Sequence, residues 1–299
     1  MAKRTKLERT QVLTPFLIVL SVIIGIYCIS LLLPLGWALF SSLREDMFFV
    51  SSPFKLEDIE TIIFTNYTEM FSGLPVEVTS IYGDTYKVTF IGMLCNSLLY
   101  SVGVSFLANF SRSMVAYVCA RYKHLRWPGI IHALVIVLMT VAFPGNIAVA
   151  IQFYKMVGMY NNLFVCVPLS ALSFGGAHFL YLYAAYSSLS REYAESAEID
   201  GANQLTVMFK IMMPMVKNIF IAVFILEFIA HWNDYTPSQL YLNAYPMLTY
   251  GLYLFKNYES RPIPIQFAGC MVVMLPTLIL FVIFRNQIMS NLSIGGLKG

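Results

Sequence analysis

Charged residues are scarce in this sequence. Asp, Glu, Lys and Arg make up 12% of the 299 residues, about half of the roughly 25% that soluble domains carry. Hydrophobic residues make up 58%, and the mean hydropathy is +0.70. This composition excludes an ordinary soluble domain and predicts an integral membrane protein.

Motifs that carry chemistry are absent as well. The sequence has no G-x-x-x-x-G-K-[ST] phosphate loop, so we do not expect it to bind ATP by that route. Its five cysteines are scattered without a C-x-x-C pair, and a free cysteine in an apolar segment behaves as a small hydrophobic residue. The four histidines lack partners at metal-ligand spacing, and no nucleophile–base arrangement stands out. We therefore expect a non-enzyme with no catalytic residue, cofactor or metal of its own.

Uncharged apolar runs place the membrane spans, because about 20 such residues cross a bilayer. Residues 235–255 are also uncharged, but Pro237, Pro246, Gln239 and Asn243 make them a poor span. They are interpreted as an outer loop with a short or re-entrant helix. The predicted fold is an all-α membrane protein, a single domain over residues 1–299. Its six spans are expected at about 12–43, 88–121, 127–155, 163–188, 214–233 and 266–285.

Basic residues flank the first two spans on one side of the membrane. They are Lys3, Arg4, Lys6 and Arg9 before span 1, and Arg121, Lys123 and Arg126 after span 2. The loop between these spans is acidic instead. By the positive-inside rule both termini are expected in the cytoplasm. The basic turn thus has a topological explanation, and no nucleic-acid partner is expected.

The loop over residues 189–213, between spans 4 and 5, has a helical pattern of its own. Ala194, Ala197 and Gly201 fall at i, i+3 and i+7, so one face carries almost no side-chain bulk. An apolar ridge follows at Leu205, Met208, Phe209 and Met212, and Pro214 is expected to end the pattern. A small face beside a turn and a ridge, with acidic residues nearby, is suited to docking into a groove on another protein. A solvated amphipathic helix is the alternative.

This loop resembles the EAA loop of the membrane subunits of ATP-binding-cassette (ABC) importers. The matching positions are Glu195, Ala197, Asp200, Gly201, Ala202, Phe209, Ile211 and Pro214. Ser196 replaces the usual second alanine, and Asn218 stands where many relatives have a proline. Further segments resemble the carbohydrate-uptake branch, specifically its six-span permease similar to the second maltose-type subunit. They are Asn96-Ser-Leu-Leu, Ala116 to Tyr122, Trp232-Asn-Asp234 and Gly295 to Gly299.

The resemblance implies a permease subunit in the bacterial cytoplasmic (inner) membrane. Its partners would be a homologous second permease, two copies of a cytoplasmic ATPase that hold ATP and Mg²⁺, an extracytoplasmic solute-binding protein and membrane lipid. The cargo would be an oligosaccharide moved by alternating access. The residues that would couple to the ATPase are Glu195, Ala197, Asp200, Gly201, Ala202, Phe209 and Pro214. Permeases for polyamines, phosphate esters or peptides carry similar loops, and a secondary transporter is a more distant alternative.

Polar residues inside the expected spans are the candidates for a substrate path. Glu227 is the only acidic residue in a span, and Arg112 is the one basic residue well inside span 2. A charge at this depth is costly, so such residues contact substrate, form half of a gate or pair with another charge. His178, Trp232 and Asn233 complete the candidate path. For His178 the alternative is a packed, hydrogen-bonded histidine, and Arg112 could instead extend toward the interface.

Overall fold

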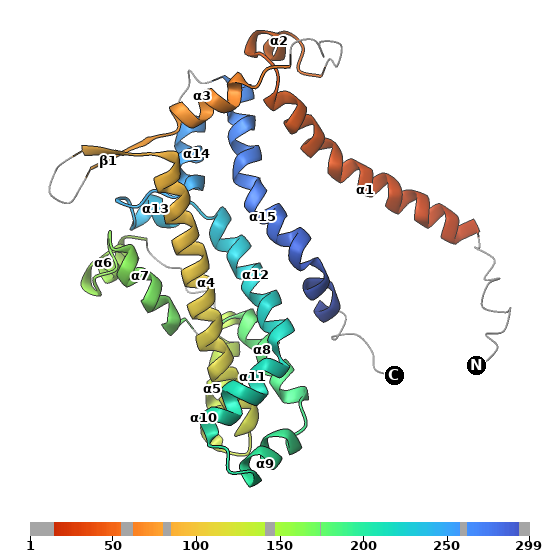
Figure 1. The fold of residues 1–299 in the computed structure, drawn as a ribbon, viewed down its shortest axis with the longest axis vertical. Helices are drawn as coiled ribbons and strands as arrows, with labels where there is room; N and C mark the ends of the chain where they lie inside the picture. The colour runs from red at the N-terminus through yellow and green to blue at the C-terminus, as the bar shows by residue number, and fades with distance from the viewer. Residues whose placement is uncertain are drawn as a thin grey trace. The chain divides into compact units, whose positions relative to one another are not determined.

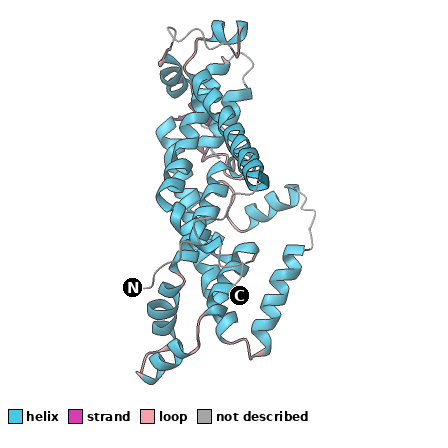
Figure 2. Cartoon of the chain, turned by 90° about the vertical axis from the view of Figure 1, so that its right-hand side faces the viewer, coloured by secondary structure: helices cyan, strands magenta, loops and turns pink. Residues whose placement is uncertain are grey.

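The computed structural model describes residues 15–54, 62–79, 85–140, 147–173, 175–257 and 262–292. Helices dominate these residues (Figures 1 and 2). The basic residues before span 1 and the segment Gly295 to Gly299 lie outside this described part. The chain forms two compact units, residues 1–70 with 260–272 and residues 71–259 with 273–299. Helix α15 (Ile263–Leu292) contributes to both units, and the single domain over 1–299 stays a prediction.

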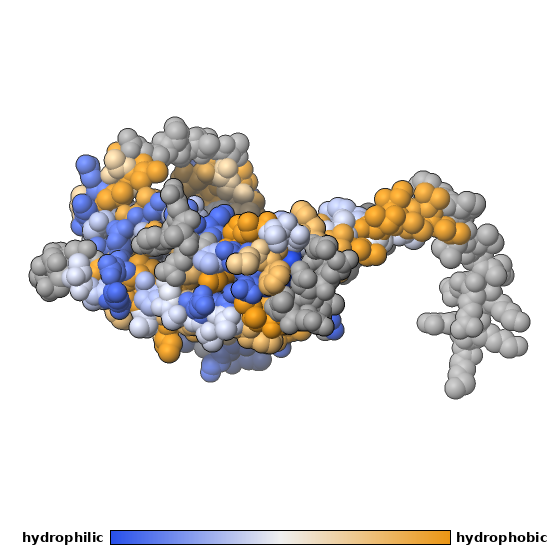
Figure 3. All heavy atoms as spheres, turned by 90° about the horizontal axis from the view of Figure 1, so that it is seen from above, coloured by the Kyte–Doolittle hydropathy of each residue, from blue (hydrophilic) through white to orange (hydrophobic). Residues whose placement is uncertain are grey.

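The first unit is built on α1 (Pro15–Ser42), whose residues are apolar all round. Many of its side chains are exposed on the isolated chain, as expected of a helix that faces lipid; apolar surface is orange in Figure 3. After α1 the chain turns through α2 (Asp46–Ser51) toward α3 (Thr65–Gly73). This turn is fixed by Asn66, whose amide donates to the carbonyls of Ser42 and Arg44 at 2.9 and 2.7 Å.

The second unit is organised around α4 (Phe90–Arg121), the long yellow helix in Figure 1. It begins at the N-cap Thr89, whose side chain accepts from the Gly92 N–H. It packs mainly against α8 (Ala177–Ser188) and α12 (Lys217–Asn233). Small residues permit this close packing. At Gly103 the approach to α7 (Leu163–Leu169) is so close that an added Cβ would lie 2.5 Å from Val167.

Three described helices are long and apolar enough to span a membrane, and the number rises to five if two bent helix pairs each count as one span. The three long helices agree with expected spans 1, 2 and 6. Expected span 3 corresponds to two shorter apolar helices, α5 (Arg126–Thr140) and α6 (Ile147–Met156). Expected span 4 is broken between η3 (Ser170–Leu172) and α8, where Gly176 has a φ of 94°.

Two further expectations are corrected or refined. The prediction of an all-α chain is wrong in one place, because β1 (Val76–Thr79) and β2 (Thr85–Val88) form an antiparallel hairpin. Its period-two alternation is too short to stand out in the sequence. The poor span over 235–255 contains the short helices α13 (Thr236–Leu240) and α14 (Leu248–Asn257), as the short-helix interpretation expected.

Candidate coupling segment and buried charge cluster

The loop after α8 folds as a chain of short helices, which we call the coupling segment (residues 189–215). It contains α9 (Glu192–Ile199), α10 (Gln204–Thr206), the π-helix η4 (Val207–Met212) and α11 (Met213–Met215). The predicted turn at Asp200 and Gly201 is confirmed. Gly201 has a φ of 85°, the left-handed conformation that commonly follows a helix and that glycine adopts without a Cβ penalty.

The small face of α9 points into the protein, which corrects its expected role as a free docking face. Ala194 and Ala197 are buried in the same apolar cluster as the ridge residues Met208 and Met212, and α9 packs on η4. Small side chains on this face allow α9 to lie close against η4. Ala197 therefore has an internal packing position.

The opposite face of the coupling segment is open. Ile199 is 87% exposed, and Tyr193 and Leu205 are also exposed. Of the residues that resemblance assigned to coupling, Glu195, Asp200, Gly201, Phe209 and Pro214 are exposed, whereas Ala202 is half-buried. The surface available to a partner is therefore this mixed acidic and apolar face.

Pro214 does not end the helical segment where the sequence analysis expected. It lies inside α11, directly after η4, and the break comes at Val216, with a bend of 75° before α12. Proline is tolerated here because it occupies the first turn of α11, where its missing N–H costs little. The coupling segment and α12 are thus covalently continuous but sharply angled.

Arg121, at the end of α4, ties the coupling segment to that helix. Its guanidinium donates to Glu198 at 3.0 Å and lies 3.8 Å from Glu195. Gln204 donates to the same Glu198 oxygen at 3.0 Å and accepts from the Tyr122 hydroxyl at 2.9 Å. Hydrogen bonds from Gln204, and then from Arg121, lower the pKa of Glu198 below its ordinary value. The charge pattern of the sequence explains Arg121 by topology alone and does not predict this contact.

A second arginine–carboxylate pair lies within the helices. Arg112 on α4 forms an ion pair with Glu227 on α12, and His178 Nδ1 on α8 lies 2.9 Å from the same Glu227 oxygen. Arg112 also donates to the Gly175 carbonyl at 3.0 Å and to Ser173 at 3.3 Å. Three expected path residues therefore meet at one point, which we call the buried charge cluster (Arg112, His178 and Glu227).

Two of the three residues in this cluster are charged and buried. Glu227 is 3% exposed and Arg112 is 9% exposed. Pairing offsets part of the cost of taking both charges out of water. The second carboxylate oxygen of Glu227 has no hydrogen-bond partner among the described residues. His178 is less covered than its partners, with 30% of its side chain exposed. The pairing alternative considered for Arg112 and Glu227 is thus the observed geometry.

The two remaining path candidates, on the same helix as Glu227, have hydrogen bonds of their own. Trp232 is fully buried, stacks on Phe228 and donates to the Val273 carbonyl at 2.9 Å. Asn233 is exposed, and its amide donates to the Ile229 carbonyl of its own helix at 2.8 Å. Both side chains are therefore hydrogen-bonded to backbone carbonyls of this chain.

Helix α4 also carries a row of buried polar residues that was not among the predicted site residues. Asn109 donates to the Phe220 carbonyl on α12 at 2.9 Å, and the Ser113 hydroxyl lies 2.8 Å from that of Tyr186 on α8. Ser97 accepts from the backbone N–H of Leu248 on α14 at 2.8 Å. The i, i+4 spacing of these small polar residues was the available signal. The full row is Ser97, Ser101, Ser105, Asn109 and Ser113, all buried.

Comparison with known families decides the class of protein. The family described as "binding-protein-dependent transport system inner membrane component" matches residues 112–293, more than half of the chain. The chain belongs to this family. It is a permease component of an ABC transport system in the inner membrane. The matched region includes both the coupling segment and the buried charge cluster.

Several curated permeases are similar over most of the chain. The arabinooligosaccharides transport system permease protein AraQ of Bacillus subtilis is 27% identical over 81% of each chain. The diacetylchitobiose uptake system permease protein NgcG of Streptomyces coelicolor is 26% identical, covering 90% of this chain and 85% of the relative. The sulfoquinovosyl glycerol transport system permease protein SmoH of Agrobacterium fabrum is 25% identical over 92% of each.

A solved structure has the same fold. It is a chain of a bacterial ABC transporter involved in the import of the acidic polysaccharide alginate. The two chains superpose with a TM-score of 0.70, covering 96% of this chain and 99% of the other. At 17% identity this likeness establishes the fold alone.

Proposed function

We propose that this permease carries an oligosaccharide through the bacterial cytoplasmic membrane, driven by ATP hydrolysis on a partner. Its expected assembly contains a homologous second permease, two cytoplasmic ATPase subunits and an extracytoplasmic solute-binding protein. ATP and Mg²⁺ would be held by the ATPase. The curated relatives support a carbohydrate, since AraQ and NgcG are named for oligosaccharide uptake.

The observation that carries the coupling role is the geometry of residues 189–215. This segment exposes Glu195 and Ile199, is fixed to α4 through Arg121, and continues into α12 after the bend at Val216. An ATPase bound to the exposed face would move α9 and η4 together, because α9 packs on η4 and their buried residues belong to one apolar cluster. That motion would reach α12 through α11.

The buried charge cluster supplies a means of converting such motion into a change of access. Arg112, His178 and Glu227 lie on three different helices. A shift of α12 relative to α4 and α8 would separate these groups and require new partners, which water or sugar hydroxyls in an open path can provide. The cluster would then be closed in one state and solvated in the other. We place Trp232 and Asn233 beside this path as weaker candidates.

The orientation follows from the same proposal. Both termini and the coupling segment would lie in the cytoplasm, and the β1–β2 hairpin outside. Cysteine placed at Glu77 should react with an impermeant thiol reagent from outside intact cells, whereas cysteine at Ser196 should react only after permeabilisation. The native cysteines are first replaced, because Cys28, Cys95 and Cys270 are exposed on the isolated chain. The reverse pattern would contradict a cytoplasmic coupling segment.

The transport role is tested in proteoliposomes that hold the complete importer. Radiolabelled arabinooligosaccharides, diacetylchitobiose and maltodextrin are offered with the binding protein, with and without internal ATP. ATP-dependent uptake of one of these sugars is expected. ATP-dependent uptake of a polyamine or phosphate ester, without uptake of any of these sugars, would show that the importer carries a non-sugar solute. Sugar uptake by this chain without an ATPase would revive the secondary-transporter alternative.

A further inference from the structure

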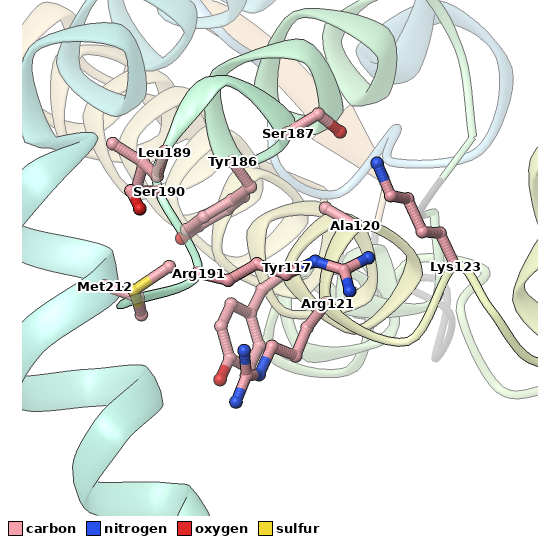
Figure 4. Close-up of a pocket in the computed structure, with 10 residues that line it drawn as sticks. All are labelled: Tyr117, Ala120, Arg121, Lys123, Tyr186, Ser187, Leu189, Ser190, Arg191 and Met212. Carbon is pink, nitrogen blue, oxygen red and sulfur yellow. The ribbon is translucent and has the colours of Figure 1, made fainter. Parts of the chain in front are cut away.

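A pocket of about 170 Å³ lies behind the coupling segment. Its lining comes from the end of α4, the end of α8 with the loop that follows it, and η4 (Figure 4). One water needs only about 10–15 Å³ of such space, so the pocket has room for a tetrahedral oxyanion with its first substituent atoms. None of the seven residues assigned to ATPase coupling lines this pocket, although Leu189, Ser190, Arg191 and Met212 of the coupling segment do.

The lining of the pocket is strongly basic. Arg121, Lys123 and Arg191 all contribute to it, and no acidic residue does. Among the described residues, Lys123 and Arg191 have no ion-pair partner. Lys123 and Arg191 are exposed to solvent, whereas the Arg121 side chain is only 13% exposed and is shared with Glu198. The three cations give this side of the pocket a positive potential, which solvent screens least at Arg121.

Hydroxyl groups complete the set of donors. Tyr117 is 3% exposed, and its hydroxyl has no hydrogen-bond partner among the described residues. The neighbouring Tyr186 hydroxyl is engaged by Ser113. Ser190 accepts from the Glu192 N–H, which leaves its own proton available. A buried hydroxyl without a partner is costly, so the unpaired Tyr117 group points to a ligand that supplies an acceptor.

We propose that this pocket binds a phosphate group, carried either by a phospholipid headgroup or by a small soluble phosphate compound. Guanidinium groups match phosphate oxygens in paired hydrogen bonds, and a lysine supplies a compact positive charge. The Tyr117 and Ser190 hydroxyls donate to the remaining oxygens. A neutral sugar would gain no charge interaction from Lys123 and Arg191, so it fits this lining less well than a phosphate group does.

Occupancy of the pocket acts on the coupling segment through Arg121. This side chain lines the pocket and also binds Glu198 on α9. A phosphate group competes with the carboxylate for the same guanidinium, so binding loosens α9 from α4. This regulatory consequence rests on the proposed coupling function, whereas phosphate binding itself does not.

The experiment measures binding directly on the purified complete importer. In detergent free of anionic lipid, equilibrium dialysis with radiolabelled inorganic phosphate is run on the wild type, on Lys123→Gln/Arg191→Gln, and on Tyr117→Phe. Lys217→Gln serves as the matched control, because Lys217 is exposed on α12 outside the pocket. In a second arm the same proteins are placed in nanodiscs of phosphatidylcholine with or without phosphatidylglycerol, and retained lipid is counted by native mass spectrometry.

A soluble phosphate site predicts saturable dialysis binding that weakens at least about tenfold in the double variant, a few-fold in Tyr117→Phe, and not in Lys217→Gln. A lipid headgroup site predicts no dialysis binding but one retained phosphatidylglycerol that the double variant loses. No binding in either arm, or binding that the double variant leaves unchanged, overturns the proposal. Sugar uptake is measured on the same preparations, so failure of the transport function is seen separately from failure of phosphate binding.

Discussion

The two arginine–carboxylate pairs on α4 have the same chemistry in different surroundings. Arg121 binds Glu198 at the end of the helix, where 32% of the Glu198 side chain is exposed, and Arg112 binds Glu227 inside it, where only 4% of the Glu227 side chain is exposed. The Arg121–Glu198 pair is the more exposed of the two, so solvent screens it more and it contributes less. Removing one member of a buried pair leaves an uncompensated charge, at a cost of about 3–5 kcal/mol. Breaking the second pair should therefore destabilise the fold more than breaking the first.

The largest effect is expected from breaking the buried pair. Arg112→Met and Glu227→Gln should each lower the melting temperature of the purified importer and the yield of assembled complex. In Arg112→Met the Glu227 carboxylate is left buried without its cation. The double variant removes both charges and should recover much of the loss. Thermal unfolding followed by size-exclusion chromatography measures this, and losses that simply add in the double variant would contradict a direct pair.

The same variants separate packing from transport. If Glu227 also lines the path, the double variant should regain assembly and basal ATPase activity but not sugar uptake. Recovery of uptake together with assembly would reduce the cluster to a structural pair. The second Glu227 oxygen, which has no hydrogen-bond partner in the described part of the chain, is the group that would accept a sugar hydroxyl if Glu227 lines the path.

A second effect is expected at the turn of the coupling segment. Gly201 has a φ of 85° and no atom within 4 Å of an added Cβ, so a larger residue meets strain but no clash. Gly201→Leu should cost about 1–2 kcal/mol locally and strongly reduce ATPase stimulation by the loaded binding protein. Gly201→Asn is the control, since asparagine tolerates this conformation. Equal activity of the Leu and Asn variants would show that the turn geometry is not used in coupling.

A smaller effect is expected from reversing an exposed charge. Glu195→Lys replaces a carboxylate that lies 3.8 Å from the Arg121 guanidinium by a second cation, on the face available to the ATPase. It should slow assembly of permease with ATPase, and the defect should be greatest at low salt because exposed charges act mainly on association rate. Surface plasmon resonance at two ionic strengths measures it. Unchanged kinetics at low salt would place Glu195 outside the contact.

The smallest effect is expected at the exposed pair itself. Arg121→Gln should raise hydrogen exchange in residues 192–206 modestly, with Arg126→Gln as the control from the same basic turn. The folded-state pKa of Glu198 lies below its ordinary value, so its stabilisation is complete above that ordinary range and is lost as pH falls through the lowered pKa. Wild-type protection should therefore be constant between about pH 6 and 8. A decline in protection within that pH window would show that a group other than Glu198 holds residues 192–206 in place.

The sequence predicted the elements of these two regions better than their contacts. Patterns at i, i+3 and i+7 located the small face of α9 and the turn at Gly201. They did not show that Ala197 packs inward, because periodicity reveals that a face exists but not what covers it. Arg112 and Glu227 were singled out by the cost of charge in a membrane, yet they are 115 positions apart in the chain. Their pairing depends on how α4 and α12 pack.

Breaks in the helices were the least predictable feature. An uncharged run of suitable length predicts a continuous span, whereas residues 163–188 are interrupted near Gly176 and the helix leading into α12 bends at Val216. Neither the π-helix η4 nor the placement of Pro214 inside α11 leaves a mark in hydropathy. The small polar row on α4 did leave a mark at i, i+4 spacing.

That polar row has a consequence for how α4 can move. Residues four apart on an α-helix are offset by about 40° and about 6 Å, so the row from Ser97 to Ser113 winds around α4 like a screw thread. Ser97 is bonded to α14, Asn109 to α12 and Ser113 to α8. A screw motion of one such step would carry each polar side chain into the place of its neighbour. Such a step would also separate Arg112 on α4 from Glu227 on α12, so this ion pair opposes the motion that the polar row would permit.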